Sequence, residues 1–183
     1  MVKQLMRMVQ NVPGDTAECG VYKGASSYLM IQANSASPHA KTHHIFDSFE
    51  GLSSPETVDG EHWTKGDLAY ADSLVKENLL PFESGRDYIC YLGWIPTRFC
   101  DVGKVAFSFV HIDVDLYQPT KDSIEFFYPR VANGEIIVCD DYGFNSCPGA
   151  TKAIDEFLLD KHEKMIALSS GGGFLIKSAF TGV

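Results

Sequence analysis

Hydrophobic runs of strand length alternate along the chain with segments whose hydrophobic residues recur at helical spacing. The runs predict five strands, over residues 16–21, 43–46, 88–92, 107–112 and 135–139. The helical spacing predicts four helices, over residues 26–36, 67–80, 119–128 and 150–159. Two last runs, 165–168 and 173–176, are joined by a connection too short for a helical crossover, so they are expected to pair antiparallel.

Strands that alternate with helices indicate an α/β fold, in which a mainly parallel sheet carries helices on both faces. No repeat, low-complexity stretch or linker divides the sequence, so residues 1–183 are expected to form a single domain. In such sheets, ligands bind outside the carboxyl ends of the strands. The residues at those ends are therefore the candidates for a functional site.

The charge of the chain lowers the expectation of nucleic-acid or membrane partners. Lys and Arg number 15 against 24 Asp and Glu, a net charge of −9, and an acidic protein is repelled by phosphate backbones and anionic lipids. No hydrophobic run reaches the roughly 18–20 residues of a membrane span. The first residues also lack the hydrophobic core and cleavage site of a signal peptide. We expect a cytoplasmic protein.

The cysteines predict no disulfide framework and no zinc site. There are five, an odd number, and none forms a C-x-x-C pair. We expect reduced, buried thiols at Cys19, Cys90, Cys100, Cys139 and Cys147.

Acidic residues mark the ends of four predicted strands. Since these ends meet at one edge of a parallel sheet, six carboxylates are expected to converge there, and each like-charged pair costs on the order of 1 kcal/mol or more. A ligand that supplies cations or hydrogen-bond donors would neutralise such a cluster. The six residues are Glu18, Asp47, Asp113, Asp115, Asp140 and Asp141.

The first two strand ends indicate a ligand with a positive charge and a ribose. Glu18, Gly20 and Gly24 have the spacing E-x-G-x-x-x-G, which differs from the G-x-G-x-x-G of a dinucleotide site. A carboxylate in this turn suits a ligand that carries an amine or another cation. Asp47 ends the next strand, a position from which a carboxylate binds the two hydroxyls of a ribose.

The later strand ends indicate a hard metal ion. Asp113, Asp140 and Asp141 have no His or Cys at ligand spacing, and oxygen donors alone favour Mg²⁺ or Ca²⁺ over Zn²⁺. Neighbouring residues of a strand point to opposite faces, so Asp140 and Asp141 share an ion only where the strand gives way to a loop. Tyr142 and Gly143 mark that point.

Several motifs together resemble the macrocin O-methyltransferases of the TylF and MycF type, over about residues 13–177. The resemblance implies a Rossmann-like class I methyltransferase with a seven-stranded, mainly parallel sheet and an antiparallel last strand. The motifs are ECGV at 18–21 followed by Gly24 and Ser26-Ser27, FDSFEGL at 46–52, HIDVDLY at 111–117, PTK at 119–121, YPR at 128–130 and DDYG at 140–143.

The resemblance also implies a function and the residues that perform it. The function is S-adenosylmethionine- and Mg²⁺-dependent O-methylation of a small-molecule hydroxyl, on a sugar of a natural product or glycoside. By position, the implied sites are the methionine end of the cofactor at Glu18, Gly20, Gly24 and Ser26, its ribose at Asp47, Ser48 and Phe49, its adenine at Gly93 and Trp94, and Mg²⁺ at Asp113, Asp140 and Asp141.

The expected chemistry is in-line transfer of a methyl group from a sulfonium to an oxygen. A cation held by aspartates lowers the pKa of the acceptor hydroxyl, and either Asp113 or Asp115 accepts its proton. Three other residues are expected to be structural: His111 bonded to a neighbouring strand residue, Lys121 in water, and Trp63 packed on the core from the long loop 50–66.

Two other functions remain open at this stage. A nicotinamide-dependent oxidoreductase would use a similar sheet, but it needs the absent G-x-G-x-x-G turn and gives the aspartates no task. A non-catalytic S-adenosylmethionine-binding protein would keep the pocket without turnover. Only about fifteen residues precede the first strand, fewer than in the family, so an open active site or one covered by a second subunit of a homo-oligomer is expected.

Overall fold

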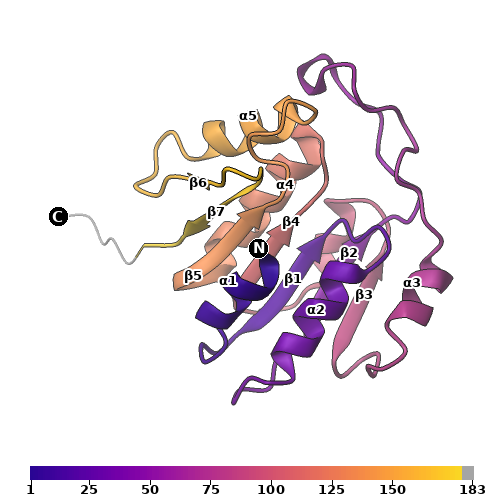
Figure 1. The fold of residues 1–183 in the computed structure, drawn as a ribbon, viewed down its shortest axis with the longest axis vertical. Helices are drawn as coiled ribbons and strands as arrows, with labels where there is room; N and C mark the ends of the chain where they lie inside the picture. The colour runs from indigo at the N-terminus through magenta and orange to yellow at the C-terminus, as the bar shows by residue number, and fades with distance from the viewer. Residues whose placement is uncertain (179–183) are drawn as a thin grey trace.

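The computed structural model describes residues 1–178, which form one seven-stranded sheet with helices on both faces (Figure 1). The single domain expected over 1–183 includes residues 179–183, which lie outside the described part. The strands are β1 Asp15–Cys19, β2 His43–Asp47, β3 Tyr88–Leu92, β4 Phe107–Ile112, β5 Val131–Cys139, β6 Ile166–Ala167 and β7 Gly173–Ile176. The helices are α1 Val2–Met8, α2 Ala25–Asn34, α3 Asp72–Asn78, α4 Tyr117–Phe127 and α5 Pro148–Phe157, with 3₁₀ turns η1 Thr57–Asp59, η2 Thr97–Asp101 and η3 Tyr128–Arg130.

The sheet has the strand order β3-β2-β1-β4-β5-β7-β6. Strands β1 to β5 pair in parallel, and β7 pairs antiparallel with both β5 and β6. This confirms the predicted α/β class and the antiparallel last strand, β7, which lies between β5 and the edge strand β6. The order changes direction between β1 and β4, and ligands of such sheets bind at that switch point.

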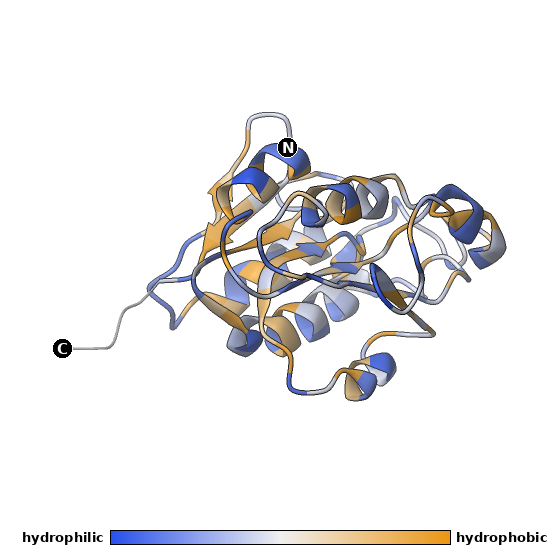
Figure 2. Cartoon of the chain, turned by 90° about the horizontal axis from the view of Figure 1, so that it is seen from below, coloured by the Kyte–Doolittle hydropathy of each residue, from blue (hydrophilic) through white to orange (hydrophobic). Residues whose placement is uncertain are grey.

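Two hydrophobic layers hold the helices on the sheet. On one face, Phe109 of β4 packs with Met30 of α2 and with residues of α1. On the other face, Val110 of β4 packs with Ile124 of α4 and Ile154 of α5. Figure 2 shows the consequence: the strands are mostly hydrophobic, whereas each helix carries a hydrophobic and a hydrophilic side. Because both faces of the central strands are covered, their carboxyl ends are held in fixed positions.

Two helices differ from the sequence-based expectation. The helix predicted over 67–80 is wrong in its first turn and a half: α3 begins at Asp72, and Leu68 has a left-handed backbone with φ of 62°. The Asp67 carboxylate accepts the Thr64 N–H and forms a turn instead. Helix α1 was not predicted; it buries Leu5 and Met6 against the α2 face of the sheet.

The prediction that the cysteines form no disulfide is confirmed, whereas the prediction that all five are buried is only partly correct. All five thiols are free, but Cys100 is exposed and Cys90 is half-buried. Within residues 1–178, no helix has the length and hydrophobicity that crossing a membrane requires.

The loop after β2 passes beside α5 (Figure 1). One buried carboxylate, that of Asp59, fixes this loop to the starts of α4 and α5. Asp59 accepts the N–H of Tyr117, the first residue of α4, at 2.6 Å. A Cβ atom added at Gly149, in the first turn of α5, would lie 1.9 Å from Asp59 Oδ1. The contact between the loop and α5 therefore requires glycine at position 149.

We predict that Gly149→Ala destabilises the protein by about 1–3 kcal/mol, because the methyl group displaces a buried carboxylate from its hydrogen bonds. The melting temperature should fall by about 2–4 °C per kcal/mol. Gly103→Ala is the control, since a Cβ there meets nothing within 4 Å. Equal melting temperatures for the two variants would contradict the proposed fit.

Candidate functional site

A cavity of about 530 Å³ opens at the carboxyl ends of the parallel strands. Its walls come from the turns after β1, β2, β3 and β4 and from the start of α4. Among the lining residues are Gly20, Asp47, Trp94, Asp113 and Asp115. This cavity at the switch point of the sheet thus has carboxylates from two strand ends in its wall, Asp47 after β2 and Asp113 and Asp115 after β4.

Gly20 brings the ends of β1 and β4 into close contact. Its φ is +78°, and a Cβ atom at this position would lie 1.8 Å from the carbonyl oxygen of Asp113. A side chain would therefore clash with the backbone in a conformation that already disfavours one. The close contact between these two strand ends therefore requires glycine at position 20.

Asp47 is held by backbone N–H groups at the end of β2. Its Oδ2 accepts the N–H of Val21 at 2.8 Å, and its Oδ1 accepts the N–H of Phe49 at 2.7 Å. Burial raises the pKa of Asp47, and these hydrogen bonds oppose the rise. Each oxygen has a second lone pair, so the oriented carboxylate is able to accept two further hydrogen bonds from a ligand.

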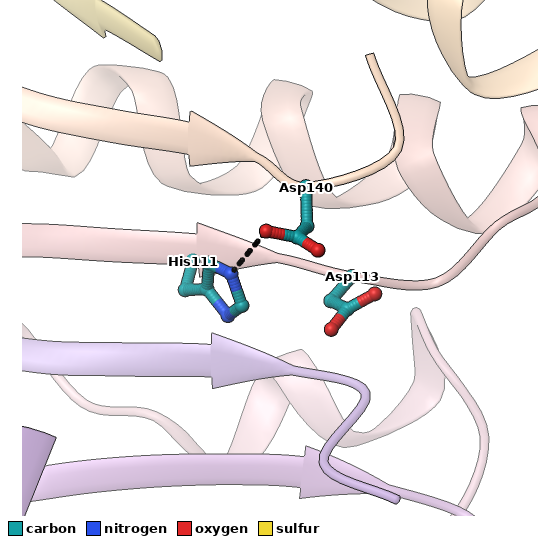
Figure 3. A group of neighbouring side chains, drawn as sticks. All are labelled: His111, Asp113 and Asp140. Carbon is teal, nitrogen blue, oxygen red and sulfur yellow. Dashed lines mark hydrogen bonds and ion pairs between the residues drawn. The ribbon is translucent and has the colours of Figure 1, made fainter. Parts of the chain in front are cut away.

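Asp113, Asp140 and His111 form the first group of possible metal ligands (Figure 3). One ligand atom from each lies within 4.8 Å of the others. His111 Nε2 lies 3.5 Å from Asp140 Oδ1. Burial and the charge of Asp141 raise the pKa of Asp113 well above its usual range. Negative charge in this group therefore exceeds what the protein itself neutralises.

Glu18 lies beneath this group and is fully buried on the α2 face of the sheet. Its carboxylate accepts hydrogen bonds from the Ser27 hydroxyl and from His111 Nδ1, the latter at 2.9 Å. Although burial opposes ionisation, hydrogen bonds with His111 and His43 lower the pKa of Glu18 to about 2. Burial likewise disfavours a charged His111, but Asp140 and Glu18 raise its pKa to about 10. His111 is thus an imidazolium that donates one N–H to Glu18 and the other to Asp140.

Asp115, Asp141 and Cys147 form a second group at the same edge. Asp141 Oδ2 accepts the N–H groups of Val114 and Asp115 at 3.1 and 2.8 Å. Burial and then the charge of Asp115 raise the pKa of Asp141 to about 7. Burial also raises the pKa of Asp115, while the Cys147 thiol acts in the opposite direction. Burial raises the pKa of Cys147 to about 12, so the thiol stays protonated.

The structure brings many of the sequence-predicted site residues together, but in more than one layer. The cavity wall contains Gly20, Asp47, Ser48, Trp94, Asp113 and Asp115. Glu18 lies below it, and Asp140 and Asp141 adjoin Asp113 and Asp115 respectively. The remaining predicted cofactor residues are outside this wall. Gly24 is buried at the start of α2, and Ser26, Phe49 and Gly93 are half-buried. Their roles stay predictions.

Comparison with known families agrees with the motifs. The family described as macrocin-O-methyltransferase (TylF) matches residues 2–167. The chain belongs to this family.

Two curated relatives of this TylF-family chain come from Streptomyces species. One, 8-demethyl-8-(2,3-dimethoxy-α-L-rhamnosyl)-tetracenomycin-C 4′-O-methyltransferase of Streptomyces olivaceus, is 30% identical over 78% of this chain and 58% of the relative. Demethyldecarbamoylnovobiocin O-methyltransferase of Streptomyces niveus is 28% identical over 88% of this chain and 65% of the relative. The chain thus spans less than two thirds of the length of either.

Solved structures show the same architecture. The O-methyltransferase NovP superposes with a TM-score of 0.78 at 25% identity, covering 97% of the TylF-family chain and 78% of NovP. The calicheamicin methyltransferase CalS11 superposes with a TM-score of 0.80 at 22% identity, covering 96% and 76%. The likeness to CalS11 supports the fold alone.

Some residues of the site were assigned no functional role from the sequence. His111 was expected to bond to a neighbour, which is confirmed, but its two carboxylate partners were not foreseen. Trp63 packs on the core as expected, and its indole N–H also lies 3.4 Å from Cys147 Sγ. One signal for the role of His111 was available in the sequence. His111 lies two residues before Asp113, and alternate strand residues share a face, so the two side chains would be expected to point the same way.

The raised pKa of Asp141 gives the TylF-family chain a pH-dependent stability. Because the folded-state pKa of about 7 lies above the usual value of 3.8, ionisation weakens the fold, and the free energy of unfolding falls as pH rises through this interval. Asp141→Asn removes the charge and keeps an oxygen for both backbone N–H groups. We expect its melting temperature in EDTA to exceed that of wild type, with a larger difference at pH 8 than at pH 5.

Glu125→Gln is the control for this measurement, because Glu125 is an exposed carboxylate on α4. It should leave the melting temperature unchanged at both pH values. A difference between Asp141→Asn and wild type that shrinks as pH rises would contradict the assigned cause.

Proposed function

We propose that this chain transfers the methyl group of S-adenosylmethionine to a hydroxyl of a small-molecule glycoside, with Mg²⁺ bound beside the reacting atoms. The observation that carries this is the cavity at the switch point, with an oriented carboxylate after β2 and an acidic group after β4 and β5. Membership of the TylF family supports methyl transfer to oxygen.

The cofactor fits the cavity by shape and charge. The Asp47 carboxylate, held by Val21 and Phe49, suits the two hydroxyls of a ribose. The indole of Trp94 offers a flat surface to the adenine. Gly20 admits the methionine portion near Asp113, where the positive sulfonium meets negative charge. A pyrophosphate in this place would face the same carboxylates, which disfavours a nicotinamide cofactor.

The acidic group fits a hard divalent cation. Asp113 and Asp140 of the first group and Asp141 of the second offer oxygen donors, and burial and then neighbouring carboxylates raise the pKa values of Asp113 and Asp141. His111 donates both of its N–H groups and has no lone pair left for a metal. We assign these three aspartates as the residues that would hold Mg²⁺, which when bound would lower the pKa of the acceptor hydroxyl.

Asp115 is the group that we assign to take the proton. It lines the cavity next to the aspartates, and burial raises its pKa toward that of a useful base. In the transfer, the acceptor oxygen forms a bond to the methyl carbon while the bond from sulfur to that carbon breaks. The hydroxyl proton goes to Asp115, and S-adenosylhomocysteine leaves uncharged at sulfur.

The names of the relatives indicate the acceptor class. One acts at the 4′ oxygen of a rhamnosyl tetracenomycin, and another, from Micromonospora griseorubida, is a mycinamicin III 3″-O-methyltransferase. We propose that the acceptor of this chain is a sugar hydroxyl on a natural-product glycoside. Rhamnosyl glycosides are the first compounds to test.

We predict that S-adenosylhomocysteine raises the melting temperature of the wild type, and that Asp47→Asn weakens its binding at least about tenfold. The loss follows from removing a charged hydrogen-bond acceptor, worth about 1.5–3 kcal/mol. Isothermal titration calorimetry measures both proteins, with the α3 variant Asp72→Asn, outside the cavity wall, as the control. A wild type that ignores this ligand but is stabilised by NAD would instead support the oxidoreductase.

Removal of the metal should stop transfer without releasing the cofactor. In EDTA, or in the Asp140→Asn variant, we expect methyl transfer to fall at least about tenfold, while the affinity for S-adenosylhomocysteine stays within twofold of wild type, about 0.4 kcal/mol. Transfer of a radioactive methyl group to a panel of rhamnosyl glycosides gives the rate. Full turnover in EDTA would rule out the assigned metal role.

A further inference from the structure

The loop after β2 reaches the far side of the site and is fixed there at two points. Asp59 is buried and accepts the N–H groups of Glu56, in its own turn, and of Tyr117, at the start of α4. Four residues later, the indole of Trp63 packs on the core beside Cys147, the residue that precedes α5. The loop therefore crosses from the cofactor wall to the acidic edge of the sheet.

A chain of hydrogen bonds leads from this loop to the site. The Trp63 indole N–H donates to Cys147 Sγ at 3.4 Å, and the Cys147 thiol donates to Asp115 Oδ1 at 3.6 Å. Cys147 and Asp115 are both buried, with 3% and 7% of their surface exposed. The three residues come from three separate segments, after β2, β5 and β4.

Asp115 itself is held in an unfavourable backbone conformation. Its φ is +60°, which is uncommon for a residue other than glycine and is found at functional sites. The carboxylate of Asp141 accepts its N–H at 2.8 Å. The backbone is thus fixed by Asp141, whereas one side-chain oxygen is directed by the thiol of Cys147.

We propose that Trp63 and Cys147 are positioning residues that hold the carboxylate of Asp115 at the edge of the cofactor cavity. The role of the contact between Cys147 and Asp115 in methyl transfer rests on the proposed function, whereas the contact itself is independent of that function. Trp63 orients the thiol by occupying its sulfur lone pair, and the thiol proton then points to Asp115. The loop after β2 therefore sets the direction of the proton-accepting oxygen.

Three variants separate this role from simple packing. Cys147→Ala removes the donor, Cys147→Ser replaces it with a hydroxyl, and Trp63→Phe removes the indole N–H while keeping an aromatic ring. Cys100→Ala is the control, because this exposed thiol lies in η2 and donates to Thr97. Crystal structures of the wild type and variants with S-adenosylhomocysteine show the position of Asp115 without any need for turnover.

We expect the Asp115 carboxylate to move by about 1 Å or more in Cys147→Ala and to stay in place in Cys147→Ser. With a glycoside that the wild type methylates, Cys147→Ala and Trp63→Phe should lower kcat about tenfold, whereas the KM for S-adenosylmethionine stays unchanged and Cys147→Ser restores most of kcat. A merely structural role would not give this division between kcat and KM.

Two results would overturn the proposal: an Asp115 carboxylate that keeps its position in Cys147→Ala, or an unchanged kcat in both Cys147→Ala and Trp63→Phe. If the wild type binds no S-adenosylhomocysteine, the proposed function fails, and structures of the ligand-free variants still decide whether the thiol holds Asp115. If Cys147→Ala does not fold, Trp63→Phe decides by the same measurements.

Discussion

Negative charge gathers at the carboxyl ends of β1, β4 and β5, and its compensation is the constraint on which the site depends. His111 is central to this balance, because as an imidazolium it lies between buried Glu18 and half-exposed Asp140. Burial and then the charge of neighbouring carboxylates raise the pKa values of Asp113 and Asp141. A buried cluster of like charges is costly to ionise, and such costs are typical of the compromise between stability and function.

The fold keeps these charges in place through the burial of the central strands. Strands β1 and β4 are covered on both faces, and the close approach of Gly20 to Asp113 fixes the distance between their ends. The loop after β2 adds a third support from Asp59. Side chains that meet at the site therefore come from segments far apart in the sequence but are carried by a rigid frame.

The order of strands and helices was predictable because both faces of a parallel sheet select continuous hydrophobic runs. The prediction was wrong where local bonds competed with spacing. Residues Leu68, Ala71, Val75 and Leu79 have helical spacing, but the turn made by Asp67 delays the helix to Asp72. Helix α1 is too short for its spacing to stand out, and its stability comes from packing on α2 and the sheet.

By itself, the sequence determined that the six carboxylates lie at one edge, since strand ends of a parallel sheet share that edge, and its motifs indicated the TylF family. The tertiary structure alone decided how these carboxylates are grouped. Glu18 lies beneath the cavity, Asp113 lies with Asp140, and Asp141 lies with Asp115. It also decided that the Trp63 indole reaches Cys147 and that the Cys147 thiol reaches Asp115. The physical reason is that side-chain direction follows the strand face and the path of a long loop, and tertiary packing sets both.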